Sequence, residues 1–322
     1  MSLSKITFGP VPSRRLGRSL GINNIPPKVC SYSCVYCQVG RTDTIQITRQ
    51  PFYDPKSILT DVKRKINKII ELGESIDFLA FVPDGEPTLD INLGRAIELL
   101  RPLGVKIAVI SNASLIGQKS VRNDLSKADW VSLKIDAIPK NIWRHINRPH
   151  HDLDLSSILE AMLQFAEKYE GELVTETMLV HGVNDSPGDI KKVADFLGQL
   201  NSAKAYLSIP TRPPAEIWVH PPVENILNMA YQVVSKRVKN VECLFGYEGN
   251  AFSFTGNVEE DLLSIISVHP MQEKAVREFL AKAEANWALI DNLIAQDRLF
   301  ATEYEGKKFY LRRLQKKQSL KK

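Results

Sequence analysis

Cys30-Ser31-Tyr32-Ser33-Cys34-Val35-Tyr36-Cys37 places three of the four cysteines of this 322-residue chain within eight positions. Cysteines at this density in one short loop are typical of a metal or iron–sulfur site, because thiolates are ligands of both. A closed structural zinc site needs four protein ligands, whereas this loop supplies three. The remaining cysteine, Cys243, lies more than two hundred residues away. The sequence therefore predicts a site whose last coordination position is taken by something other than protein.

The cysteine spacing, three residues and then two, with Tyr36 directly before the last cysteine, resembles the signature loop of the radical S-adenosylmethionine (radical SAM) superfamily. That resemblance implies that Cys30, Cys34 and Cys37 hold three irons of a [4Fe–4S] cluster, whose fourth iron is chelated by S-adenosyl-L-methionine (SAM). It also implies that an electron from a reductant such as flavodoxin or ferredoxin splits SAM and releases a 5′-deoxyadenosyl radical. The part of the protein is then to bind and orient the reactants and to exclude water from the site. A zinc-stabilised binding protein without catalysis is the alternative from another class.

The composition is that of a globular chain. A hydrophobic content of 43% is ample for a core. No run of about eighteen apolar residues occurs, and the start, Met-Ser-Leu-Ser-Lys, lacks the apolar stretch of a signal peptide. Clustered cysteines at ligand spacing do not form a disulfide framework, and an oxygen-sensitive cluster needs a reducing compartment. We therefore expect a cytoplasmic protein with no membrane partner.

Helical and strand patterns alternate from residue 55 onward, after a predicted loop over residues 8–20 and a first strand at 20–25. The predicted helices are 57–72, 93–103, 119–128, 155–169 and 189–200, and the further strands are 76–82, 105–110, 130–135, 172–180 and 204–209. Six strands alternating with helices predict an α/β fold whose parallel sheet has right-handed crossovers. Periodicity alone also permits a doubly wound sheet. The family resemblance implies a partial (β/α)6 barrel.

Polar residues follow the predicted strands at the edge where parallel sheets carry their chemistry. Asp84-Gly85-Glu86-Pro87 resembles the family's Gly-Gly-Glu-Pro motif, with Asp84 in place of the first glycine. By the resemblance, Gly85 and Glu86 contact the amino group of SAM. The resemblance also implies that residues at the later strand ends contact the ribose and carboxylate of SAM and that Tyr36 lies near its adenine. The alternative for each polar residue at a strand end is that it only caps a helix or forms a turn. The candidates at these later strand ends are Ser111, Asn112, Lys134, Asp136 and Glu176.

Residues outside these motifs allow two interpretations each. Arg14, Arg15 and Arg18 precede the cysteine loop, and Arg212 follows the last predicted strand. Guanidinium groups there can bind an anionic substrate, or they form a solvated basic lip. Cys243, in a predicted short strand, is either a small buried hydrophobe or a thiol that returns a hydrogen atom to a substrate radical.

The pattern changes after residue 257. Helical periodicity covers 258–268, 269–282 and 287–296, and 299–311 alternates as a β-hairpin does. This order predicts a small winged-helix-like module over 258–322 beside a radical SAM core over 1–257. Residues 307–322 carry eight Lys and Arg and no acid. Winged-helix modules commonly bind RNA or DNA, and they also dock proteins; for the basic run, a solvated tail is the further alternative.

A narrower resemblance is to the radical SAM proteins related to the tRNA wyosine-base synthetase. It is carried by Phe-Gly-Pro-Val-Pro-Ser-Arg-Arg-Leu-Gly-Arg-Ser-Leu-Gly-Ile-Asn over residues 8–23 and by Gln-Val-Gly-Arg-Thr over 38–42. Those synthetases use a second cluster on upstream cysteines, and no cysteine precedes Cys30, so their reaction is not expected here. We expect a radical SAM enzyme that modifies a macromolecule, with a structured RNA such as tRNA, delivered by the C-terminal module and basic tail, as the first hypothesis. An activase or a peptide- or protein-modifying enzyme is the alternative.

Overall fold

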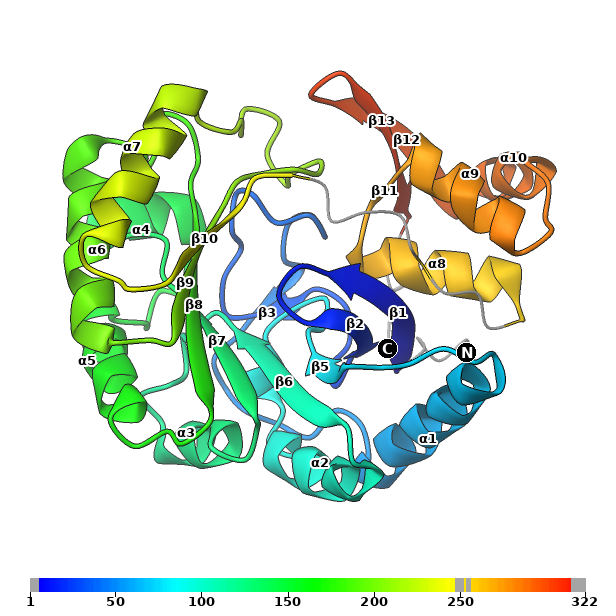
Figure 1. Ribbon diagram of the computed structural model, residues 1–322, viewed down its shortest axis with the longest axis horizontal. Coiled ribbons are helices and arrows are strands. Elements are labelled where there is room, and N and C mark those ends of the chain that lie inside the picture. Colours follow the sequence, from blue (N-terminus) through cyan, green and yellow to red (C-terminus); the bar gives the residue numbers. More distant parts are fainter. Residues whose placement is uncertain (1–5, 247–251, 253–255, 314–322) are drawn as a thin grey trace, which may run out of the picture.

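The computed structural model describes residues 6–246, 252 and 256–313. One eight-stranded sheet, in the order β1-β2-β5-β6-β7-β8-β9-β10, curls into an open half-barrel (Figure 1). Strand β1 is antiparallel to β2, and every other neighbouring pair in this sheet is parallel. The strands are β1 (Thr7–Ser13), β2 (Gly17–Ile22), β5 (Phe78–Phe81), β6 (Lys106–Ser111), β7 (Trp130–Lys134), β8 (Glu172–Met178), β9 (Lys204–Ser208) and β10 (Val241–Leu244).

Helices cover the outer face of the sheet (Figure 1). They are α1 (Pro55–Glu71), α2 (Leu93–Leu100), α3 (Lys119–Leu125), α4 (Lys140–Asn147), α5 (Leu155–Ala166), α6 (Pro187–Leu200) and α7 (Glu224–Ser235). Short elements fill the connections: β3 (Val29–Cys30), β4 (Thr44–Ile45), and the 3-10 turns Pro87–Leu89 and Arg101–Leu103. None of the helices within the described ranges has the length and apolar character needed to cross a membrane.

Alternation along the strands divides the core into two layers. In β5, Leu79 and Phe81 belong to the large cluster shared with the helices, whereas Ala80 belongs to a smaller cluster on the inner face with Trp130 and Tyr206. A strand covered on both faces carries apolar residues in an unbroken run, as residues 78 to 82 do. The small side chain of Ala80 lines the cavity described below.

The predicted barrel strands and helices are confirmed, with bounds shifted by a few residues. The loop prediction over residues 8–20 is wrong, because β1 and β2 form an antiparallel hairpin there. Pro10 and Pro12 argue against a strand in the sequence, but an edge strand tolerates proline since one side of its backbone has no ladder partner. The sequence analysis also does not predict α4 or α7, and β1 and β10 extend the expected six strands to eight.

The C-terminal elements pack on the N-terminal hairpin. They are α8 (Val258–Val268), β11 (Met271–Gln272), α9 (Glu273–Lys282), α10 (Ala288–Ala295), β12 (Leu299–Tyr304) and β13 (Lys307–Arg312). Their sheet has the order β11-β13-β12, which includes the predicted hairpin. Phe8 and Val11 of β1 share one hydrophobic cluster with Leu262, Phe279 and Tyr310. The division at residue 257 and the likeness to a winged helix stay predictions, and residues 314–322 of the basic tail lie outside the described residues.

Candidate functional site

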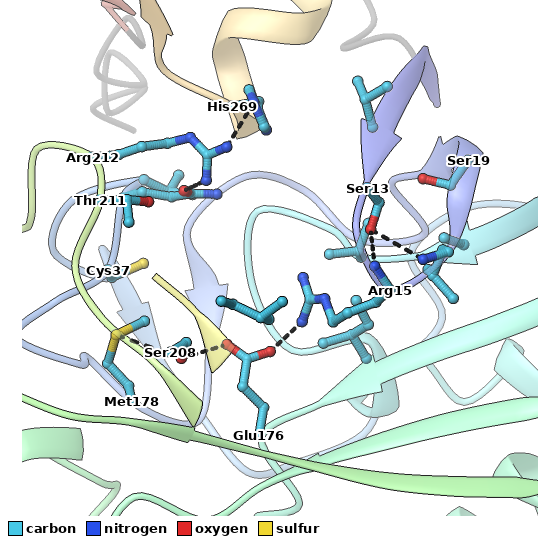
Figure 2. Close-up of a pocket in the computed structure, with 18 of the residues that line it drawn as sticks. Ser13, Arg15, Ser19, Cys37, Glu176, Met178, Ser208, Thr211, Arg212 and His269 are labelled. Atoms are coloured by element: carbon cyan, nitrogen blue, oxygen red, sulfur yellow. Dashed lines mark hydrogen bonds and ion pairs between the residues drawn. The ribbon is translucent and has the colours of Figure 1, made fainter. Parts of the chain in front are cut away.

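A cavity of about 330 Å³ lies at the carboxyl ends of the parallel strands (Figure 2). Its walls come from the β1–β2 hairpin, the strand ends, the cysteine loop and the segments that hold Arg212 and His269. Figure 2 shows Arg15 and Glu176 pointing toward each other across one part of the cavity, with Arg212 and His269 near the opposite end. Four of the predicted site residues line it: Tyr36, Cys37, Lys134 and Glu176. The fold thus brings together residues from distant parts of the chain.

The cysteine loop is held in place by backbone contacts. The amide of Val35 donates to the carbonyl of Ile146 at 2.9 Å, and the amide of Cys37 donates to the carbonyl of Cys34 at 3.1 Å. Gly85 of the Asp-Gly-Glu-Pro turn packs directly on the loop, because a Cβ at this position would lie 1.9 Å from the carbonyl oxygen of Val29. Any side chain at position 85 would therefore displace the loop, while the contact of Gly85 with SAM stays a prediction.

The three cysteines are partly buried, and their sulfurs do not all lie within 4.8 Å of one another. Burial raises the pKa of Cys30, Cys34 and Cys37, that of Cys34 to about 12, so ionisation needs a cation beside them. Two sulfurs bound to one zinc ion at about 2.3 Å lie at most about 4.6 Å apart. Within the described residues, only an exposed His-His-Asp loop at 150–152 brings three ligand atoms within 4.8 Å of one another. The three thiols thus do not form a preformed site for one zinc ion.

Two side-chain amides contact the cysteine sulfurs. Nδ2 of Asn112 lies 3.5 Å from Sγ of Cys30, and Nδ2 of Asn147 lies 3.4 Å from Sγ of Cys34. Asn112 is a predicted site residue, whereas the sequence analysis does not find Asn147. It is the last residue of α4, a helix that the pattern does not predict, and its spacing from the cysteines carries no signal.

Glu86, Ser111 and Asn112 are brought together by hydrogen bonds behind the cysteine loop. Oε1 of Glu86 accepts from Ser111 Oγ at 2.8 Å and from the amide and hydroxyl of Thr88 at 3.1 and 2.6 Å. Oε2 accepts from the amide of Asn112 at 2.7 Å. Burial raises the pKa of Glu86, and these hydrogen bonds oppose that rise. The carboxylate is thus engaged within the protein, where it orders the turn after β5 and the end of β6.

Asp84 is a cavity-lining carboxyl with one buried oxygen that accepts no hydrogen bond from the described residues. It is 4% exposed and lines the cavity, and its Oδ1 has no hydrogen-bond partner among the described residues. Burial raises its pKa to about 7, although Arg312 and Lys28 act in the opposite direction. Because a buried polar group without a partner is costly, a donor on a bound molecule would complete this site.

Glu176 joins two cations on the cavity wall. Arg15 pairs with Oε2, Lys134 Nζ lies 3.3 Å from Oε1, and Ser208 Oγ donates to Oε1 at 3.1 Å. Burial alone would raise the pKa of Glu176, but Arg15 and Lys134 outweigh it and lower the pKa to about 2. The N-terminal arginines differ in their placement. Arg15 lines the cavity, whereas Arg18 pairs with Glu74.

Tyr36 and Asp136 meet beside the cysteine loop. The Tyr36 hydroxyl donates to Oδ2 of Asp136, which also accepts from Asn147 Nδ2 at 2.7 Å. The Tyr36 ring lies under Lys134, whose Nζ is 4.8 Å from the ring centroid. Asp136 is 3% exposed and is not among the residues that line the cavity. It therefore positions Tyr36 and Asn147 from behind the wall.

Cys243 packs away from the cavity. It lies against the cluster that the sheet shares with the helices, whereas its neighbour Leu244 belongs to the inner cluster and lines the cavity. This placement favours the small hydrophobe over a thiol that reaches a substrate radical.

Comparison with known proteins places the chain in a family. The family model for the radical SAM superfamily matches residues 24–197. A UPF0026 protein of Methanocaldococcus jannaschii is 48% identical over 96% of each chain. A dual-specificity RNA methyltransferase of Anaeromyxobacter dehalogenans is 26% identical over 52% of this chain and 46% of that protein. The solved structure of TYW1 with a lysine-pyruvate adduct bound covers 69% of this chain and 74% of its own, with a TM-score of 0.51 at 17% identity, and so shares the fold.

The match of the family model spans more than half of the chain and includes the cysteine loop, the Asp-Gly-Glu-Pro turn and the polar ends of β6, β7 and β8. The fold agrees, since the curled parallel sheet carries its cavity at the carboxyl ends of the strands. This protein belongs to the radical SAM superfamily and is an enzyme of that type, which uses a [4Fe–4S] cluster and SAM.

Proposed function

We propose that this enzyme cleaves SAM reductively at a cluster held by Cys30, Cys34 and Cys37 and modifies a base of a structured RNA, with tRNA as the first substrate to test. The observation that supports the proposal most directly is the cavity, which has Cys37 on one wall and the Arg15–Glu176–Lys134 network on another. When bound to Cys30, Cys34 and Cys37, the cluster would supply the electron for the cleavage of SAM, whose 5′-deoxyadenosyl part would then take a hydrogen atom from the substrate.

The residues present fit the cluster. The loop offers three thiols that need a metal beside them to ionise, and these three sulfurs do not all lie within 4.8 Å of one another. Amide hydrogens of Asn112 and Asn147 face two of the sulfurs. These features support iron–sulfur ligation over the zinc alternative.

Different residues around the cavity would bind different parts of SAM. Following the family resemblance, we assign the backbone at Gly85 to the methionyl amino group, with Glu86 ordering that turn. Lys134 and Glu176 would meet the methionyl carboxylate and the ribose hydroxyls, because they present opposite charges 3.3 Å apart on the wall. Tyr36 would border the adenine. Ser111, Asn112 and Asp136 would hold these groups in place through the hydrogen bonds described above.

The C-terminal elements support an RNA substrate because they reach the cavity. His269 lines it and lies 2.8 Å from Nη2 of Arg212, and the Tyr304 hydroxyl donates to the carbonyl of Pro210 at 3.3 Å. An RNA bound to this module would therefore lie close to the site of radical formation. Exposed Lys307 and Lys308 stand on β13, and a relative is named as an RNA methyltransferase.

The experiment uses anaerobically reconstituted holoenzyme with a flavodoxin or ferredoxin as reductant. We expect total tRNA to accelerate 5′-deoxyadenosine release and to bind with an affinity that falls steeply with salt. Replacing the lysines at 307, 308, 316 and 317 by alanine should weaken binding and flatten the salt dependence. Deleting residues 258–322 is a poor test, because it would expose Phe8 and Val11 of β1. Acceleration that survives ribonuclease treatment would contradict an RNA substrate.

A polypeptide substrate is the second candidate, and one observation favours it. Ile217 is 94% exposed and Trp218 is 40% exposed on the segment that leaves the cavity after Arg212. Exposed apolar side chains beside a cavity are typical of a protein-binding surface. Ribonuclease-resistant acceleration by a protein fraction, lost in Ile217→Ser, would select this candidate.

We also propose that the enzyme works in the cytoplasm. The cluster needs low-potential electrons, and thiols stay reduced in that compartment. Fractionation of the source cells, with the cluster measured in each fraction, tests this placement.

A further inference from the structure

The side chains of Asn112 and Asn147 reach the cysteine loop from different elements. Asn112 follows β6, and Asn147 ends α4. Their Nδ2 atoms lie 3.5 Å from Sγ of Cys30 and 3.4 Å from Sγ of Cys34. Both separations are suitable for an N–H group that donates to a sulfur atom.

Other contacts fix which end of each amide faces the sulfur. Oδ1 of Asn112 accepts from the amide of Ser114 at 2.9 Å, and its Nδ2 also donates to Ser31 Oγ at 2.9 Å. Nδ2 of Asn147 donates to Oδ2 of Asp136 at 2.7 Å, and a carboxylate can only accept. Asn112 thus has one N–H directed to oxygen and the second directed to the sulfur of Cys30. The second N–H of Asn147 lies between Sγ of Cys34 and the Tyr36 hydroxyl, which is 3.3 Å from Nδ2.

The third sulfur is in a different environment. Cys37 lines the cavity, and the described residues provide no side-chain hydrogen bond to its sulfur, which receives a backbone contact from Val39. Side-chain amide donors thus face the two cysteine sulfurs that do not line the cavity.

We propose that Asn112 and Asn147 are positioning residues that raise the reduction potential of the cluster by donating N–H···S hydrogen bonds to the thiolates of Cys30 and Cys34. The proposal rests on the cluster ligands assigned in the proposed function. Reduction adds one electron, and the extra negative charge is shared with the cysteine sulfurs. An N–H donor stabilises that charge more in the reduced state than in the oxidised state. The two amides therefore favour the reduced cluster, from which the electron passes to SAM.

The test measures the midpoint potential of the one-electron cluster couple by a dye-mediated titration of reconstituted holoenzyme, without substrate. Asn112→Leu and Asn147→Leu keep the branched shape and the number of heavy atoms of the side chain and remove the donor. Each should shift the potential to a more negative value, and the double variant should shift it further. The matched control is Asn184→Leu: this 2%-exposed asparagine donates to the carbonyls of Asp136 and Met178 and contacts no cysteine sulfur.

Unchanged potentials in both variants, with an intact cluster absorbance, would overturn the proposal, and so would an equal shift in Asn184→Leu. A second measurement covers the case in which Asn147→Leu does not fold, since it leaves buried Asp136 with one donor fewer. In the wild-type holoenzyme labelled with side-chain ¹⁵N asparagine, the reduced cluster should show hyperfine coupling to ¹⁵N. Absence of that coupling would also overturn the proposal. Failure to assemble any cluster would instead contradict the proposed function.

Discussion

Two carboxyl groups in one turn, Asp84 and Glu86, occupy opposite environments. Glu86 accepts four hydrogen bonds from Thr88, Ser111 and Asn112, whereas Oδ1 of Asp84 accepts none from the described residues. The family resemblance assigns the cofactor contact to Glu86. The geometry makes Glu86 an ordering residue and leaves Asp84 as the carboxyl that is open to a bound molecule.

Asp84→Asn should stabilise the protein at high pH. Burial raises the pKa of Asp84 from 3.8 to about 7, so the folded state binds this proton more tightly than the unfolded state does. The free energy of unfolding of the wild type therefore falls as the pH rises from about 4 to about 7. The neutral amide avoids this loss, and the gain above pH 7 is up to about 4 kcal/mol.

Thermal unfolding of both holoenzymes at pH 5 and pH 8 measures the difference. The gain should be large at pH 8 and should shrink toward acid. The same substitution at exposed Asp43 is the control and should change neither value. A variant that is less stable than the wild type at pH 8 would show that Asp84 has a donor in the folded protein.

Glu86→Gln should destabilise the protein even without SAM. The amide oxygen can replace Oε1, which accepts three of the hydrogen bonds, but the amide nitrogen then faces the backbone N–H of Asn112. Two opposed donors in a buried site cost about 2–3 kcal/mol. Unfolding of SAM-free holoenzyme measures this loss, with exposed Glu98→Gln as the control. Full stability combined with weaker SAM binding would instead make Glu86 a direct SAM ligand.

At the scale of residues, the sequence predicts site residues that lie close together along the chain. It misses site residues that only the tertiary fold brings together. The three cysteines and the turn at Gly85 and Glu86 are recognisable because their neighbours along the chain are also their neighbours in space. Asn147 reaches Cys34 through α4, across 113 positions, and no local pattern records such a contact. The environment of Asp84 likewise depends on Arg312, from the other end of the chain.

At the scale of elements, the cysteine loop depends on close packing against the turn after β5. Gly85→Ala would place a methyl group 1.9 Å from the carbonyl oxygen of Val29, so the loop must move. We expect the variant to retain markedly less iron and sulfide per chain after reconstitution. Gly117→Ala is the matched control, because its Cβ would meet nothing within 4 Å. Equal iron content in the two variants would contradict the steric argument.

The β1–β2 hairpin links the barrel to the C-terminal elements. Phe8 is 2% exposed and packs in one cluster with residues of α8, α9 and β13. Phe8→Ala should cost about 3–5 kcal/mol, because it leaves a cavity in that cluster. Hydrogen exchange should accelerate in α8 more than in β7, which lies in the sheet away from this cluster. Uniform acceleration in both elements would show that the cluster does not couple the hairpin to α8 in particular.

The elements also show where periodicity succeeds and fails. Continuous apolar runs in β5 and β6 and amphipathic patterns in α1, α5 and α6 are strong signals, because both faces of those strands and one face of those helices are buried. The hairpin is hidden by Pro10 and Pro12, which an edge strand accommodates. The sequence cannot reveal that this hairpin forms a cavity wall, because that follows from packing against distant residues.

At the scale of the whole molecule, three distant parts of the chain enclose one cavity. The N-terminal hairpin contributes Arg15, the barrel contributes Lys134 and Glu176, and the C-terminal elements contribute His269. The last lies outside the span that matches the family model. The chemistry at the cluster is thus common to the family, whereas substrate choice would depend on the hairpin and the C-terminal elements.

The most direct test of this account is the release of 5′-deoxyadenosine from SAM by anaerobically reconstituted, chemically reduced enzyme. The wild type and Cys243→Ala should both release the nucleoside, because Cys243 packs against the helices. Alanine at position 30, 34 or 37 should abolish release and the visible absorbance of the cluster. Release that persists in any of these three variants, or its loss in Cys243→Ala alone, would contradict the assignment of the three-cysteine loop as the cluster site.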